Sequence, residues 1–209
     1  MYGVIRQYKI DPDQIGAIVR HCREPFLPNL SKTLGFVSWT LMDAGPTLLT
    51  ASAFDDEIEA DNAAGWYREN QAALALGKPR VTRGPVVVYH VAEHVPAGYG
   101  LVWRCTFKTG DAERATQRLC DIFLPGICDI PHFASYEVIA AGGGNVVSLC
   151  AFTDRESAEE GKRRTVAWAS ENLAGSFLNV PEIIVCEIRL RTAKIAEADD
   201  RAAPIYADA

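Results

Sequence analysis

The tripeptide Phe26-Leu27-Pro28 recurs as Phe123-Leu124-Pro125, 97 residues further along the chain. Tyr2-Gly3 recurs as Tyr99-Gly100 at the same spacing. Later matches need shifts of 98 and then 102 residues, and they are Ala53-Phe54 with Ala151-Phe152, Trp66 with Trp168, and Asn70 with Asn172. Two copies of about 90 residues each predict two domain-sized folds, because two repeats are too few for a solenoid.

Each copy predicts the same order of elements: strand, helix, strand, strand, helix, strand. In the first copy, a strand over residues 3–10 is followed by Asp11-Pro12, a helix N-cap and a proline at the first helical position. Apolar residues then recur at helical spacing from Ile15 to Phe26, and the prolines at 28 and 125 are expected to end these helices or to turn the chain just after them.

A hairpin and a second helix complete each copy. Strands over 34–42 and 47–54 flank the turn Asp43-Ala44-Gly45-Pro46. Asp55 in the first copy, and the capping box Thr153-Asp154-Arg155-Glu156 in the second, open the second helices. The four residues added in the second copy amount to about one helical turn. β-branched strands over 81–89 and 183–190 close the two units.

This order is the ferredoxin-like βαββαβ unit, an α+β fold with both helices on one face of an antiparallel sheet. We expect the two open sheet faces to meet and form an eight-stranded intramolecular barrel. The expected boundaries are a first repeat over 1–90, a linker over 91–98, a second repeat over 99–190 and a polar tail over 191–209.

Composition favours a protein with a sizeable core and no membrane span: 48% of residues are hydrophobic, 23% are charged, and the apolar runs have the length of strands. The net charge of −6 argues against binding to a nucleic-acid backbone. Six cysteines show no C-x-x-C pattern, and five lie in the second copy, so we expect buried thiols, no metal site and a reducing cytoplasm.

The organisation resembles the dimeric α+β barrel superfamily, in particular its antibiotic-biosynthesis-monooxygenase-like (ABM) branch. The resemblance rests on Thr50-Ala51-Ser52-Ala53-Phe54-Asp55 and Ser148-Leu149-Cys150-Ala151-Phe152-Thr153, and on Trp66-Tyr67-Arg68-Glu69-Asn70 and Trp168-Ala169-Ser170-Glu171-Asn172. It implies a tandem duplication of the barrel-forming unit. For function it implies several chemistries, because the superfamily includes cofactor-free oxygenases, haem degraders, isomerases and members without known activity.

Strand alternation nominates candidate pocket residues. One face is apolar and is expected to meet the helices: Val37, Trp39, Leu41, Leu49, Ala51 and Ala53, with Ala134, Tyr136, Val138, Val147, Leu149 and Ala151 in the second copy. The opposite face is expected to line the barrel lumen and hold a partly polar small molecule. Its candidate substrate-binding residues are Ser38, Thr40, Thr50, Ser52, Ser135, Ser148 and Cys150, with Arg104 from a first strand. The alternative is a filled barrel in which these hydroxyls satisfy one another.

Glu137 and His132 are the candidate catalytic residues. Glu137 replaces Thr40 of the first copy, and a desolvated carboxylate on the lumen side would act as a general base. His132 replaces Gly35 and would stand at the barrel mouth. Because Glu137, His132 and Cys150 all lie in the second copy, we expect a single functional pocket biased towards that repeat.

Haem chemistry is disfavoured. The resemblance to haem-degrading relatives would place a histidine late in the second helix, where this chain has Leu76 and Leu178. Packing in the core explains Trp66 and Trp168 more economically.

The leading hypothesis is therefore an ABM-like enzyme without metal or other cofactor, a monooxygenase acting on an aromatic or polyketide-like compound. The rival is a non-catalytic ligand-binding or structural barrel. The expected partner is a small-molecule ligand, without nucleic acid or membrane, and a homodimer of the tandem chain is a candidate assembly.

Overall fold

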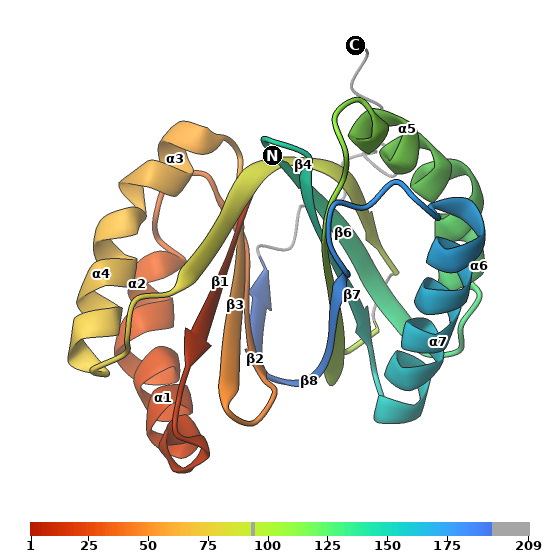
Figure 1. Ribbon diagram of the computed structural model, residues 1–209. Helices are drawn as coiled ribbons and strands as arrows, with labels where there is room; N and C mark the ends of the chain where they lie inside the picture. The colour runs from red at the N-terminus through yellow and green to blue at the C-terminus, as the bar shows by residue number, and fades with distance from the viewer. Residues whose placement is uncertain (93–94, 194–209) are drawn as a thin grey trace. The chain divides into compact units, whose positions relative to one another are not determined.

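A computed structural model of the protein describes residues 1–92 and 95–193. Contacts between residues divide the described chain into a first unit, residues 1–85 with 188–193, and a second unit, residues 86–187. Each unit carries its helices on one face of its sheet (Figure 1). The long strands β4 (Arg80–Val91) and β8 (Glu182–Ala193) each pass from one unit into the other.

The first unit follows the predicted order. Its elements are β1 (Tyr2–Lys9), the 3-10 turn η1 (Pro12–Gln14), α1 (Ile15–His21), the π-helical turn η2 (Cys22–Phe26), α2 (Leu27–Leu30), β2 (Phe36–Asp43), β3 (Thr47–Phe54), α3 (Glu57–Asn62), α4 (Ala64–Ala73) and the first half of β4. Strand β1 lies between β3 and β4, antiparallel to both. Asp11 caps the first helical turn, as predicted, by accepting a hydrogen bond from the Asp13 amide.

The second unit repeats the order. Its elements are β5 (Tyr99–Thr106), α5 (Asp111–Arg118), the π-helical turn η3 (Leu119–Phe123), α6 (Leu124–Cys128), β6 (Phe133–Ala141), β7 (Asn145–Phe152), α7 (Arg155–Asn172) and β8. Strand β5 lies between β7 and β8, and the second half of β4 pairs with β6. Asp154 caps α7 by accepting a hydrogen bond from the Ser157 amide.

These elements confirm the predicted α+β class and the two ferredoxin-like units. Followed along its hydrogen bonds, the strand order is β1-β3-β2-β8-β5-β7-β6-β4, a closed barrel. Among the described residues, no helix is both long and apolar enough to cross a bilayer. Residues 93–94 of the expected linker and residues 194–209 of the expected tail lie outside the described residues, whereas residues 191–193 belong to β8.

The helices differ from the prediction at three points. Pro28 and Pro125 lie in the first turns of α2 and α6, where proline is tolerated, so the helices end two and three residues beyond these prolines. The caps of the second helices are Asp56 and not Asp55 in the first copy, and Asp154 and not Thr153 in the second. The added turn of the second copy lies in α7, a continuous helix of 18 residues, whereas the first copy has two shorter helices that break at Ala63.

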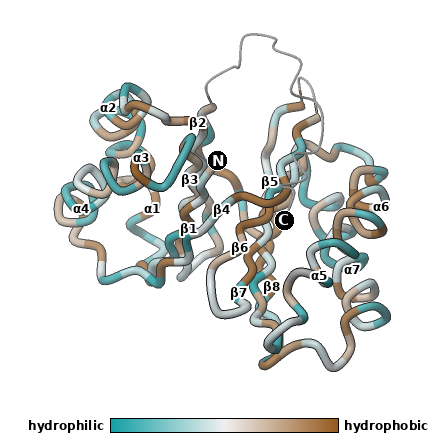
Figure 2. The backbone as a smooth tube through the Cα atoms, turned by 90° about the horizontal axis from the view of Figure 1, so that it is seen from above, coloured by the Kyte–Doolittle hydropathy of each residue, from teal (hydrophilic) through white to brown (hydrophobic). Residues whose placement is uncertain are grey.

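The register of the hairpins also corrects the assignment of sheet faces. Trp39 pairs with Ser52, and Leu41 pairs with Thr50, so these four residues share the face that packs on the helices. Odd-numbered residues of β2 from Trp39 onward face the helices, whereas in β3 the even-numbered residues do. A bulge between Phe36 and Ser38 changes the alternation once more within β2. Leu49, Ala51 and Ala53 therefore lie on the face without helices, contrary to the prediction. Figure 2 shows the helices alternating between hydrophilic and hydrophobic segments, as amphipathic packing requires.

Candidate functional site

A small cavity lies inside the first unit, between its sheet and its helices. It has about 10 Å³ of free volume, which is room for about one water molecule. Strands β1, β2 and β3 and the helix α4 supply its polar groups. Aliphatic side chains come from β2, β3, α1 and the segment after α4, and a thiol comes from η2. The lining residues are Tyr8, Ile18, Cys22, Trp39, Leu41, Leu48, Thr50, Tyr67, Asn70, Leu74 and Leu76.

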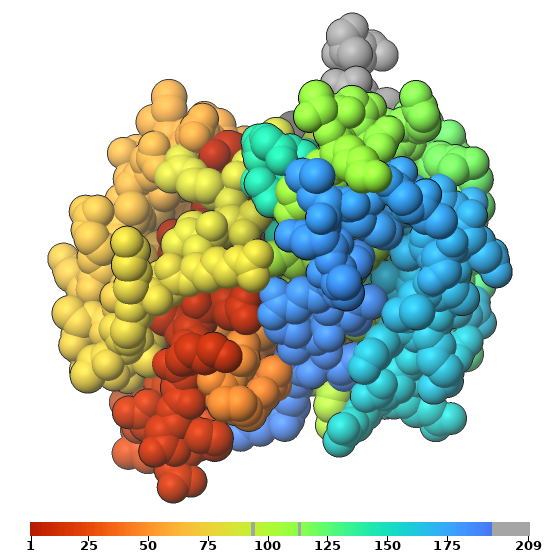
Figure 3. Space-filling model, viewed as in Figure 1, coloured from red at the N-terminus to blue at the C-terminus, as the bar shows by residue number. Residues whose placement is uncertain are grey.

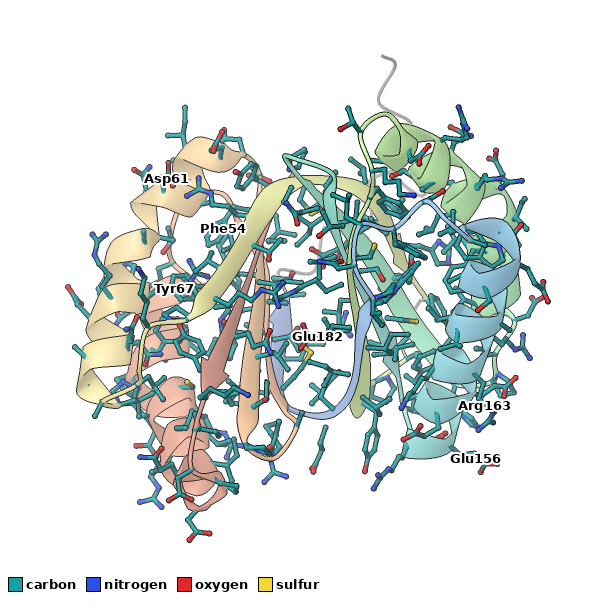
Figure 4. All side chains as sticks on the ribbon, viewed as in Figure 1. Phe54, Asp61, Tyr67, Glu156, Arg163 and Glu182 are labelled. Atoms are coloured by element: carbon teal, nitrogen blue, oxygen red, sulfur yellow. The ribbon has the colours of Figure 1, made fainter. Side chains whose placement is uncertain are left out.

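Polar hydrogens at the cavity lack partners. The Trp39 indole nitrogen and the Thr50 hydroxyl are buried, and neither has a hydrogen-bond partner among the described residues. A buried donor without a partner costs about 1–3 kcal/mol of stability, so such groups mark places where a water or ligand can bind. Tyr67 points from α4 towards the sheet (Figure 4) and adds its hydroxyl to this group.

Arg6 places a positive charge beside the cavity. Its side chain, only 8% exposed, extends from β1 on the helix-facing side of the sheet. The guanidinium carbon lies 3.5 Å from the centre of the Tyr67 ring, and Nη1 donates a 3.4 Å hydrogen bond to the Ser52 hydroxyl. Among the described residues, no carboxylate forms an ion pair with Arg6, although buried charges are normally paired.

The ionisable groups around the cavity are neutral except for this arginine. Burial raises the pKa of Tyr67 to about 12, although the Arg6 charge acts in the opposite direction. Burial likewise raises the pKa of the Cys22 thiol to about 11 and raises the pKa of Tyr8. Burial lowers the pKa of Arg6, but a guanidinium remains protonated in proteins. At neutral pH the site therefore presents one positive charge and several neutral donors.

Four predicted substrate-binding residues lie on the helix side of their sheets and not on the expected lumen side. Thr50 lines the cavity, and Ser52 bonds to Arg6 and donates to the Val4 carbonyl at 3.2 Å. In the second unit, Cys150 belongs to the buried core, and Ser148 pairs with the core residue Val138. The same parity change across the hairpin turn explains all four corrections.

The other predicted residues lie on the helix-free faces. Ser38 and Thr40 project from β2 on the face that also carries Ala53 and Ala51, their partners on β3. In the second unit, Ser135 and Glu137 lie on the helix-free face of β6, opposite Ala151 and Leu149 of β7. Arg104 also lies on the helix-free face, because its neighbours Trp103 and Cys105 face the helices. The proposed roles of these five residues, including the general-base role of Glu137, stay predictions.

His132 lies in the turn before β6 at a positive φ of 64°, as Gly35 does before β2 at 67°. Its Nε2 lies 3.8 Å from the Asp154 carboxylate that caps α7, and the histidine side chain is 61% exposed. The histidine is therefore placed at an exposed helix cap. Its catalytic role stays a prediction.

The shared tryptophans of the second helices are not equivalent in packing. Trp168 is 9% exposed, and its ring centre lies 5.0 Å from that of Phe123. In the first unit the residue that packs on the equivalent Phe26 is Tyr67, at 5.3 Å, whereas Trp66 is 40% exposed. The prediction of a core role is thus confirmed for Trp168 and wrong for Trp66, and the helices align one residue away from the sequence match.

Sequence reasoning missed the residues that build the cavity. The predicted site residues include neither Arg6 nor Tyr67. The sequence does indicate that Arg6 is buried, because Val4, Arg6 and Tyr8 lie at alternate positions of one strand and therefore share a face. Among residues 1–92 and 95–193, no group of three or more His, Cys, Asp or Glu side chains is arranged to hold a metal ion.

Solved structures with the same fold cover almost the whole chain. A candidate monooxygenase from Fusobacterium nucleatum matches with a TM-score of 0.75 and 7% identity, over 92% of this chain and 94% of that protein. A candidate monooxygenase from Lactobacillus acidophilus gives 0.71 and 10%, over 98% and 97%. An anthrone oxidase-like protein gives 0.60 and 11%, over 92% of each chain. At identities of 7–11% the likeness concerns the fold alone.

A scan against protein-family models finds no match to this chain, and a search of curated proteins finds none either.

Proposed function

We propose that the protein is a small-molecule enzyme of ABM-like type, a monooxygenase that oxidises an acidic aromatic or polyketide-like compound in the first-unit cavity. The observation that carries this proposal is Arg6, a buried guanidinium with no ion-pair partner among the described residues, beside a cavity with unpaired donors. Such a site stabilises an anion that forms on a bound molecule.

The chemistry follows from the charges. A phenol or anthrone with an acidic C–H bond binds better as its anion, because Arg6 is cationic and Tyr67, Trp39 and Thr50 are neutral donors. No group of the cavity is an anionic base at neutral pH, so the substrate proton leaves to water. The carbanion then reduces O₂ to a carbon-bound peroxide, which takes up a proton and loses water to leave a carbonyl. Overall, CH₂ and O₂ give C=O and H₂O, without an added reductant.

The supporting comparisons are the two candidate monooxygenases and the anthrone oxidase-like protein, which share the fold. A non-catalytic binder is the second candidate, and the lack of an anionic base among the cavity's tyrosines and thiol favours it. In that case, Arg6 holds an anionic ligand and oxygen is not consumed.

The test measures oxygen uptake and quinone formation with 1,8-dihydroxyanthrone, above its rate of autoxidation in buffer. We expect Arg6→Met to lower the protein-dependent rate about 100-fold or more, the cost of removing one oxyanion donor. Arg20→Met, which changes an exposed arginine of α1, is the matched control and should keep the rate. Equal rates in wild type and Arg6→Met would refute the site. Binding of the anion to wild type without oxygen uptake would establish the binder instead.

A further inference from the structure

The cavity is too small for any organic substrate, so one of its walls must move before a ligand enters. Its volume of about 10 Å³ suits a water molecule, whereas small-molecule sites in proteins enclose about 300–1,000 Å³. The question is which wall moves.

Two walls are fixed. Strand β1 is paired on both edges, to β3 and β4, so Tyr8, Leu48 and Thr50 are held by continuous strand pairing. Ile18 and Cys22 come from α1 and η2 and are fully buried in the first-unit core. Moving either wall would break many hydrogen bonds or expose the core.

The third wall is the connection between α4 and β4, residues 74–79, which contributes Leu74 and Leu76. Its backbone bonds return to the end of its own helix: the Ala75 amide donates to the Ala72 carbonyl at 3.1 Å, and the Leu76 amide donates to the Gln71 carbonyl at 2.9 Å. This is a Schellman motif, in which a residue with positive φ ends the helix. That residue is Ala75, at φ 50°, a conformation that costs a residue with a Cβ about 1–2 kcal/mol.

The same connection in the second unit is tied to the sheet. Backbone bonds of 2.8 Å join Lys108 to Ser176 and Leu178 to Thr106, and Phe177 stacks on Phe107 with ring centres 5.2 Å apart. Gly175 supplies its positive φ of 80° without steric cost. The two connections therefore differ in two ways. The first has a strained alanine and hydrogen bonds only back to its own helix in the bonds named above, whereas the second has an unstrained glycine and hydrogen bonds to the segment 106–108.

We propose that residues 74–79 form a lid over the first-unit cavity, and that Leu74 and Leu76 determine which ligands enter. The lid swings about the strained Ala75, and the two leucines on either side of it leave the cavity together. Figure 3 shows the chain after α4, in yellow, on the surface of the first unit, where it is free of covering elements in this view. The inference rests on the proposed function only in taking the cavity as the ligand site.

The test uses Cys22 as an internal reporter of opening. This thiol lines the cavity, is 1% exposed and is the one cysteine of the first copy, so its labelling by methyl methanethiosulfonate can be followed by peptide mass spectrometry. Leu76→Ala should speed its labelling about tenfold, because the lid loses apolar contact with the cavity. Ala75→Gly should slow it about fivefold, because the closed form loses its backbone strain.

Matched controls separate lid opening from unfolding. Leu178→Ala changes the 62% exposed counterpart of Leu76 in the second unit and should leave the Cys22 rate unchanged. Amide exchange of β3 reports opening of the whole first unit. If Cys22 labelling followed β3 exchange in every variant, or if Leu76→Ala left the rate unchanged, the lid would be refuted. Absence of oxygen uptake in the earlier test would leave these labelling rates as they are, so the two failures are distinguishable.

Discussion

The two repeats share one backbone plan and differ in what fills the space between sheet and helices. In the first unit that space holds Arg6, Tyr67 and Ser52 beside a cavity. In the second unit the positions of Arg6 and Ser52 are taken by Trp103 and Cys150, both buried in an apolar core. Both units bury indole and hydroxyl groups without partners, so the comparison teaches that the two units differ in one buried charge, a guanidinium in the first unit where the second has an indole.

The largest expected effect comes from exchanging charge between the copies. Trp103→Arg buries an unpaired guanidinium in a core with aromatic and thiol neighbours, and we expect a loss of about 5 kcal/mol in the free energy of unfolding. Arg6→Met should change it by no more than about 1 kcal/mol, or raise it, because a buried charge is removed. Urea unfolding followed by circular dichroism measures both. A loss of several kcal/mol in Arg6→Met would show that the arginine is structural.

The second prediction concerns alkaline pH. Burial raises the pKa of Tyr67 to about 12, and burial also raises the pKa of Tyr136 in the second unit, where no cation counteracts it. Because the neutral phenol is favoured in the folded state, Tyr67 costs the folded protein no stability below about pH 10, the pKa in the unfolded state. As the pH rises from 10 towards 12, the unfolded state gains stability by ionising and the free energy of unfolding falls.

We therefore expect the free energy of unfolding to fall by up to about 3 kcal/mol between pH 10 and 12 through Tyr67 alone. Tyr67→Phe should remove this share of the decline, and Arg6→Met should move the Tyr67 titration, read at 295 nm, to higher pH. Tyr99→Phe serves as the control. An unchanged decline in Tyr67→Phe would mean that the hydroxyl reaches solvent in the folded protein.

The smallest expected effect compares the two turns before β2 and β6. His132 adopts a positive φ that costs it about 1 kcal/mol relative to glycine, so His132→Gly should raise stability by about that amount. Its ion pair with Asp154 is exposed and is expected to contribute little. Gly35→Ala should do the opposite, since a Cβ there would lie 2.9 Å from that of Glu59. Thermal unfolding of the two variants should therefore shift in opposite directions.

The sequence predicts the fold well because duplication, helix caps and strand patterns act locally. Asp11 caps the first helical turn as predicted, whereas the caps of α3 and α7 lie one residue beyond the predicted Asp55 and Thr153. The sheet faces were harder, because alternation within a strand does not fix parity across a turn, and one bulge at Phe36 reverses it. The residues of the cavity could not be predicted for a related reason. Arg6 meets Tyr67 only when β1 and α4 pack together, and no periodicity in either segment contains that contact.

Strands β4 and β8 each begin in one unit and end in the other, and this limits where the chain can be divided. Leu190, near the end of the last strand, packs against the core of the first unit, while Val88, from the strand that ends the first copy, lies in the core of the second. The boundary between the two sequence copies is therefore not a point where the folded protein can be cut. A fragment that stops at residue 92 would lack Leu190 and would carry six strand residues, 86–91, that lie in the second unit. Each half of the chain therefore supplies the last part of its final strand to the other unit.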